Sequence, residues 1–178
     1  MIYVLLADGF EEIEALCPVD VLRRAGLAVK TVGITGKTVT GSHGIAVSAD
    51  ILPSEATEPI ELLFLPGGMP GSSNLDASPE VDALLTRALT EGAQIAAICA
   101  APFVLGVRGL LKGRRATCYP GFEDRLIGAA YTGAAVETDG VFTTGIGMGA
   151  ALDFSLRLVE ILKDKETAEK IRAGVFAK

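Results

Sequence analysis

Short apolar runs alternate with amphipathic stretches from one end of the chain to the other. Runs such as 2–7 and 61–65 are typical of strands that are buried on both faces, whereas 12–25 carries its apolar residues at helical spacing. Strands that alternate with helices predict a mainly parallel central sheet with helices on both faces. We therefore expect a single α/β domain over residues 1–178, because this length is ordinary for one domain.

The other expected elements follow the same alternation. Further strands are predicted at 28–34, at 94–98 and near 115–118, 133–137 and 141–144. Further helices are predicted at 79–91, directly after Cys99, and at about 148–162 and 165–173. Between Lys37 and Ala49, a Thr/Val alternation with two glycines predicts a small β-hairpin.

Composition and charge exclude several classes of function. The net charge is −6 and the only basic clusters are two Arg pairs at 23–24 and 114–115, which argues against a nucleic-acid partner. The longest apolar run, 95–107, is shorter than the roughly 20 residues of a membrane span. Three widely spaced cysteines and one histidine predict neither a disulfide framework nor a metal site. We expect a cytoplasmic protein without a metal, a cofactor, or a membrane partner.

Cys99 stands where the apolar run 94–98 ends and a helix is expected to begin. A cysteine at such a bend projects from the backbone, and the amides that follow it face whatever it attacks. A helix N-terminus also favours the thiolate form, which is the nucleophile. The alternative is a small buried packing residue, which is the interpretation that we adopt for Cys17 and Cys118.

Two other segments are expected at the same edge of the sheet, because the carboxyl ends of parallel strands meet there. One segment, 8–14, follows the first strand and ends in Glu14. Glu14 lies beside Ile13 and 16–17, which are apolar and are predicted to face the core. Burial there would raise the pKa of Glu14 and make it an acid and base for the thiol. Glu11 and Glu12 are interpreted as ordinary first-turn acids.

The other segment is Gly67-Gly68, which follows a strand. The amide of Gly68, together with that of Ala100, would form an oxyanion site, although a plain tight turn also explains a Gly-Gly pair. His43 is the only histidine, and its position in the hairpin predicts a solvated loop residue away from the carboxyl edge.

With these residues in place, the chain resembles the ThiJ/PfpI superfamily, and within it the protein deglycase branch associated with Parkinson's disease. The resemblance rests on four blocks in order, at 11–14, 18–26, 65–68 and 97–102. It implies a flavodoxin-like sandwich that is usually a homodimer. It also implies that Cys99 is the reactive cysteine, that Glu14 is the protonated glutamate beside it, and that Gly68 and Ala100 supply the oxyanion amides.

Two departures from the superfamily matter. Ala100 stands where protease-like and amidase-like relatives carry a histidine, which disfavours peptidase activity. Tyr119 stands where deglycase-like relatives carry a histidine near the cysteine, which leaves Glu14 as the acid and base. The resemblance also places the hairpin and the end of the first helix at the dimer contact. Arg24 and His43 are therefore predicted to line the partner subunit's site and to offer donors to a carboxylate-bearing substrate.

The resulting prediction is a cysteine-dependent, cofactor-independent glyoxalase or deglycase that acts on small α-oxoaldehydes such as methylglyoxal. The main alternative is a redox-sensing or chaperone-like dimer that responds through oxidation of Cys99. A hydrolase of small amides or isonitriles is a weaker alternative, because it would use the same nucleophile.

Overall fold

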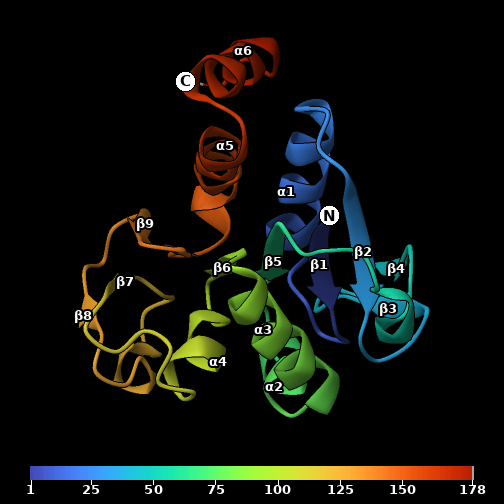
Figure 1. Ribbon diagram of the computed structural model, residues 1–178, viewed down its shortest axis with the longest axis vertical. Helices are drawn as coiled ribbons and strands as arrows, with labels where there is room; N and C mark the ends of the chain where they lie inside the picture. The colour runs from blue at the N-terminus through green and yellow to red at the C-terminus, as the bar shows by residue number, and fades with distance from the viewer. Residues whose placement is uncertain (178) are drawn as a thin grey trace.

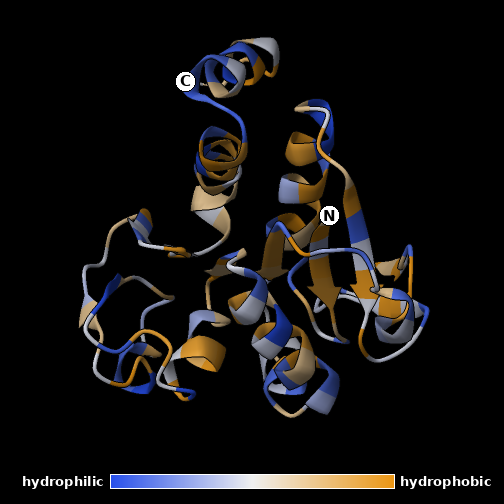
Figure 2. Ribbon diagram, viewed as in Figure 1, coloured by the Kyte–Doolittle hydropathy of each residue, from blue (hydrophilic) through white to orange (hydrophobic). Residues whose placement is uncertain are grey.

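Six strands form the central sheet of the computed structural model, which describes residues 1–177 (Figure 1). Five of them are parallel, and the edge strand β9 is antiparallel to β10. In spatial order they are β2 (Val29–Gly33), β1 (Ile2–Leu6), β5 (Leu62–Leu65), β6 (Gln94–Ile98), β10 (Phe142–Gly145) and β9 (Val136–Asp139). Strands β1, β5 and β6 are mostly apolar (Figure 2), as expected for strands that are covered on both faces. The predicted α/β sandwich is confirmed.

Helices cover both faces of this sheet. One face packs against α1 (Glu12–Arg24), α5 (Ala151–Leu162) and α6 (Lys165–Gly174), and the other against α3 (Pro79–Glu91) and α4 (Pro102–Gly106) (Figure 1). Strand β1 shows the division, because Ile2, Val4 and Leu6 belong to the first core and Tyr3 and Leu5 to the second. No helix within residues 1–177 is long and apolar enough to cross a membrane.

The smaller elements agree with most of the sequence predictions. The hairpin is confirmed as β3 (Thr38–Thr40) paired with β4 (Ala46–Ser48). The strand expected near 133–137 begins later, as β9, and a short pair forms between β7 (Arg115–Ala116) and β8 (Ala130–Tyr131). The sequence analysis missed α2 (Gly71–Asp76). It also missed two 3₁₀ turns, at Pro53–Glu55 and Glu123–Arg125, and the helix expected at about 148–162 begins with a third, at Met148–Ala150.

Helix α1 is buried along part of the predicted face, and the prediction fails in its first turn. Ile13 is 50% exposed, so the expectation that it faces the core is wrong. The buried stripe follows Ala15, Val19 and Leu22, spaced by four and three residues, as one helical face requires. Glu14 is nevertheless buried, because it lies at the helix start beside the ends of the strands.

Candidate active site

The carboxyl ends of β1, β5 and β6 bring three separate segments together, as predicted. Leu65 pairs with Ala97 in the sheet, so Gly67 and Cys99, two residues further along each strand, lie side by side. The N–H of Glu11 donates to the carbonyl of Gly67 at 2.9 Å, and this bond ties the start of α1 to the same edge. Glu11 also caps α1, because its Oε2 accepts the N–H of Glu14 at 2.7 Å.

Cys99 adopts a left-handed backbone conformation, with φ of 63°. This conformation is strained for a residue with a side chain and is maintained only where neighbouring contacts fix it. Its N–H donates to the carbonyl of Gly145 at 2.9 Å, and its own carbonyl accepts the N–H of Tyr119 at 2.8 Å. The partly exposed thiol therefore projects from a sharp strand-to-helix bend, as the sequence predicts.

Gly67 allows the acid and the thiol to approach each other. A Cβ at this position would lie 2.3 Å from Glu14 Oε2 and 2.5 Å from Cys99 Cβ, so any side chain would push the two apart. The backbone N–H groups of Gly68 and Ala100 both face the sulfur, where each lowers the pKa of Cys99 by hydrogen bonding to the thiolate. The glycine pair is thus more than a tight turn.

Glu14 is 1% exposed, and burial raises its pKa to about 7. The thiol of Cys99 and the N–H groups of Gly67 and Met148 oppose this rise as hydrogen-bond donors, whereas the negative charge of Glu11 adds to it. Within residues 1–177, Glu14 Oε2 has no hydrogen-bond partner of ordinary geometry. A buried carboxyl oxygen without a firm partner is free to exchange a proton with the sulfur beside it.

The sequence prediction of a resting thiolate is not supported. Burial, then the charge of Glu14 and its hydrogen bond, raise the pKa of Cys99 to about 12, and the two amides offset only part of this rise. The helix that follows is only five residues long, so its dipole is weak. Burial raises the pKa of both groups, and the charge of Glu14 adds to the rise at Cys99, so the two groups titrate as a pair that shares a proton.

Comparison with known proteins now decides the family, because residues 1–161 match the DJ-1/PfpI family. The chain belongs to this family. It is 37% identical to the Parkinson disease protein 7 homolog of Danio rerio over 98% of this chain and 96% of that protein. It is 32% identical to a glutathione-independent glyoxalase of Caenorhabditis elegans, over 94% of this chain and 91% of that protein. It is 30% identical to a deglycase of Pyrococcus abyssi, over 91% of this chain and 99% of that protein.

Solved structures agree with this assignment. Oxidized DJ-1 of Toxoplasma gondii superposes with a TM-score of 0.94 at 37% identity, over 98% of this chain and 97% of that one. The predicted superfamily and its flavodoxin-like fold are therefore confirmed.

Tyr119 of this DJ-1/PfpI protein also reaches the site. Its ring carbon Cδ2 would lie 3.4 Å from a Cβ on Gly147, and Glu14 Oε1 would lie 3.8 Å from the same point. The ring of Tyr119 and the carboxyl of Glu14 thus both border Gly147. Cys118, the residue before Tyr119, is fully buried in the core, which confirms its interpretation as a packing residue.

Glu12 and His43 form a second cluster that the sequence analysis missed. Glu12 is buried, and its Oε1 accepts the N–H of His43 at 2.8 Å while its Oε2 lies 2.8 Å from His43 Nδ1. The His43 ring is exposed, as predicted, but it is paired rather than merely solvated, and the hairpin lies against the start of α1. A signal existed in the sequence, since Gly41 leaves room for the carboxyl of Glu12.

The remaining predicted residue, Arg24, is not part of this cluster. It forms an ion pair with Asp20 at 2.7 Å at the opposite end of α1, about 18 Å from Glu12 at 1.5 Å per residue. Ligand atoms of Glu11, Glu12 and His43 lie within 4.8 Å of one another, but both oxygens of Glu12 already accept hydrogen bonds from the hairpin. This arrangement is that of a structural clamp.

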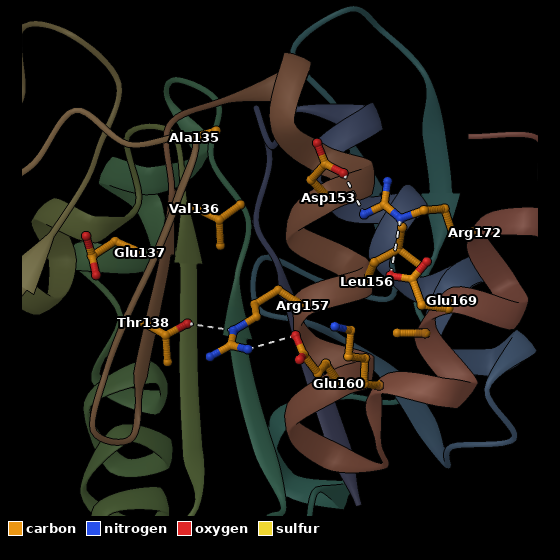
Figure 3. A pocket seen from close by; sticks show the side chains of 12 residues that line it. Ala135, Val136, Glu137, Thr138, Asp153, Leu156, Arg157, Glu160, Glu169 and Arg172 are labelled. Carbon is orange, nitrogen blue, oxygen red and sulfur yellow. Dashed lines mark hydrogen bonds and ion pairs between the residues drawn. The ribbon is translucent and has the colours of Figure 1, made fainter. Parts of the chain in front are cut away.

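A hollow of about 530 Å³ between β9, α5 and α6 lies apart from these residues (Figure 3). Two arginines that line it are paired with other lining residues. Arg157 donates to Thr138 at 3.2 Å and to Glu160 at 2.7 Å, and Arg172 to Asp153 at 3.0 Å. No predicted site residue lines this hollow, so the candidate active site remains the edge that holds Cys99 and Glu14.

Proposed function

We propose that this protein is a cofactor-independent glyoxalase or deglycase that acts on small α-oxoaldehydes such as methylglyoxal. Relatives named as a glyoxalase and a deglycase support this class of activity. The observation that carries the proposal is the juxtaposition, across Gly67, of the Cys99 thiol and a buried carboxyl whose pKa is raised to about 7. An acid and base with a pKa near the working pH is suited to repeated proton transfer.

The first step forms a carbon–sulfur bond. Glu14 in its carboxylate form takes the thiol proton of Cys99 while the sulfur attacks the aldehyde carbon. The aldehyde oxygen becomes an oxyanion that accepts hydrogen bonds from the N–H groups of Gly68 and Ala100. Glu14 then returns its proton to this oxygen, which gives a neutral hemithioacetal.

The second step moves a proton between the two carbons of the substrate. Glu14 removes the hydrogen of the former aldehyde carbon as a proton, and the electron pair left behind gives an enediolate. Glu14 then delivers this proton to the neighbouring carbon, while the hydroxyl proton moves from the first oxygen to the second, which leaves a 2-hydroxyacyl thioester on Cys99. Water then cleaves the thioester, releasing a 2-hydroxy acid (lactate from methylglyoxal) and restoring the thiol. One nucleophile and one carboxyl are sufficient, so no redox or phosphate cofactor is required.

The test is methylglyoxal consumption by the wild type and by Cys99→Ser and Glu14→Gln. We expect each variant to lose at least about a hundredfold in kcat/KM, the usual contribution of a nucleophile or a general base. Cys118→Ala is the matched control and should retain its rate, because this cysteine packs in the core. Equal rates in all four proteins would refute the proposal.

Peroxide sensing is the second candidate, since the same groups could hold an oxidised sulfur. The N–H groups of Gly68 and Ala100 and the protonated Glu14 would donate to sulfinate oxygens on Cys99, and the name of the Toxoplasma relative records an oxidized form. Mass spectrometry after mild peroxide treatment separates the two functions. Stoichiometric oxidation of Cys99 without turnover of aldehydes would favour the sensor. The amide or isonitrile hydrolase has no observation in its favour beyond the shared nucleophile.

We further propose that the protein is a cytoplasmic homodimer in which α1 and the hairpin meet their counterparts. Ile13 and Ile45 are about half exposed on these two elements and offer an apolar contact. Arg24 and His43 would then approach the partner's site as polar donors. Mixing Arg24→Ala with Cys99→Ser subunits tests this arrangement, because only a donor that acts across the interface would restore one complete site per dimer. Unchanged activity after mixing would remove Arg24 from the proposal, and the corresponding His43→Ala mixture tests His43.

A further inference from the structure

Three apolar side chains stand half exposed beside the groups that would perform the reaction. Met69, Tyr119 and Met148 are 46%, 51% and 50% exposed, and we refer to them as the apolar collar. Large apolar side chains scattered singly on a surface need no explanation. These three residues belong to different segments of the chain, yet the backbone beside each of them contacts Cys99 or Glu14.

The backbone contacts of each residue make this connection. Met69 directly follows Gly68, whose N–H faces the sulfur of Cys99. The N–H of Tyr119 donates to the Cys99 carbonyl at 2.8 Å. The N–H of Met148 lies close enough to Glu14 to lower the pKa of its carboxyl. The loops that carry the collar are therefore the loops that hold the nucleophile and the acid.

The charges around this site do not attract an anion. The negative charge of Glu14 raises the pKa of Cys99, and the negative charge of Glu11 raises the pKa of Glu14. The charged groups that influence the two reacting side chains are therefore acidic. The two cations predicted to serve the partner's site are already offset, since Arg24 pairs with Asp20 and His43 with Glu12. A substrate with its own carboxylate would meet repulsion at this edge.

We infer that the site selects neutral aldehydes that carry an apolar alkyl or aryl group beside the dicarbonyl, and that the apolar collar determines this selectivity. The inference rests on the proposed function and specifies its substrate class. It also replaces the earlier expectation of a carboxylate-bearing substrate. Methionine suits such a role because its flexible thioether adapts to ligands of different shape and packs well against aromatic groups. Tyr119 supplies a flat apolar face that borders Gly147 together with the Glu14 carboxyl.

The experiment measures kcat/KM for methylglyoxal, phenylglyoxal and 4-carboxyphenylglyoxal with the wild type, Tyr119→Ser and Met148→Gln. We expect the wild type to prefer phenylglyoxal over methylglyoxal by roughly tenfold, the lower end of discrimination by an apolar site, and to use the carboxylate-bearing aldehyde least. Each variant should lower the phenylglyoxal-to-methylglyoxal ratio severalfold, and this comparison cancels the intrinsic reactivity of the aldehydes. Ile127→Gln is the matched control, because Ile127 is 54% exposed but lies outside the collar.

A second arm keeps the inference separate from the proposed function. Alkylation of Cys99 by phenacyl bromide and by iodoacetate is followed by mass spectrometry in the same four proteins. If methylglyoxal is not consumed, the proposed function fails, and the ratio of the two alkylation rates alone decides the inference. A wild-type ratio that falls in Tyr119→Ser and Met148→Gln supports the collar. Ratios equal in all four proteins, or faster turnover of 4-carboxyphenylglyoxal than of phenylglyoxal, would overturn it.

Discussion

Two buried glutamates, two residues apart at the start of α1, have opposite electrostatic properties. Glu12 is 5% exposed and Glu14 is 1% exposed, so burial alone does not distinguish them. Burial on its own would raise the pKa of both carboxyl groups. At Glu12, however, the side-chain and backbone hydrogen bonds from His43 outweigh burial and lower the pKa, whereas at Glu14 burial prevails and the pKa is raised to about 7.

The difference shows that partners, rather than depth, decide what a buried carboxyl can do. Both oxygens of Glu12 accept hydrogen bonds from 42–43, and this carboxyl holds the hairpin against the helix. Glu14 Oε2 has no such partner in the described part of the chain and faces a thiol instead. One carboxyl is a structural clamp, and the other is available for chemistry.

The largest expected effect concerns the pH dependence of stability. Because the pKa of Glu14 is raised on folding, the native state holds its proton more tightly, and the free energy of unfolding must fall as pH rises from 4.5 toward 7. Relative to Glu14→Gln, the wild type should lose about 3 kcal/mol across this range. Urea denaturation of both proteins at several pH values measures the difference. Parallel pH profiles would contradict the assignment.

A smaller effect is expected from filling the space between the acid and the thiol. Gly67→Ala would force Glu14 and Cys99 apart and should destabilise the protein by about 1–3 kcal/mol, the usual cost of overpacking, while also lowering aldehyde turnover. Gly149→Ala is the control, because a Cβ there meets nothing within 4 Å among residues 1–177. Thermal unfolding and turnover should both be nearly unchanged in the control. Equal behaviour of the two variants would show that Gly67 is not needed for the close approach.

The smallest effect concerns the clamp. Glu12→Ala should destabilise the protein by about 1–2 kcal/mol, because the N–H of His43 and its ring lose their acceptor. The lowered pKa of Glu12 makes this contribution fade as pH falls below 4.5, and the raised pKa of His43 makes it fade as pH rises above 6.5. The loss should therefore be greatest between these values. Greatest loss at pH 8 would contradict the pairing, and His43→Ala should reproduce the same window.

The sequence predicted the sheet and the reactive edge because both follow from periodicity. Buried parallel strands appear as continuous apolar runs, and their carboxyl ends necessarily gather the residues that follow them. Helix α3 begins and ends at the predicted residues, since Ser78 caps it, Pro79 occupies its first position and Gly92 ends it in the left-handed conformation. Such local signals need no tertiary information.

What the sequence could not predict depends on contacts between distant segments. The pairing of Glu12 with His43 spans 31 residues and requires the hairpin to fold back on α1. The exposure of Ile13 depends on how α1 rotates against α5, which periodicity alone leaves open. The raised pKa of Cys99 could not be anticipated either, because it depends on burial and on a neighbouring carboxyl rather than on the bend that carries the thiol.

Direct titration of Glu14 tests the central claim most clearly. Carboxyl carbon NMR of protein labelled with ¹³C-glutamate, assigned by comparison with Glu14→Gln, reports its ionisation in the folded state. The account predicts a pKa of about 7 for Glu14 in the wild type, together with a value below 4.5 for Glu12 in the same spectra. A Glu14 pKa at or below the ordinary 4.5 would contradict the claim that this carboxyl stores the proton that Cys99 chemistry uses.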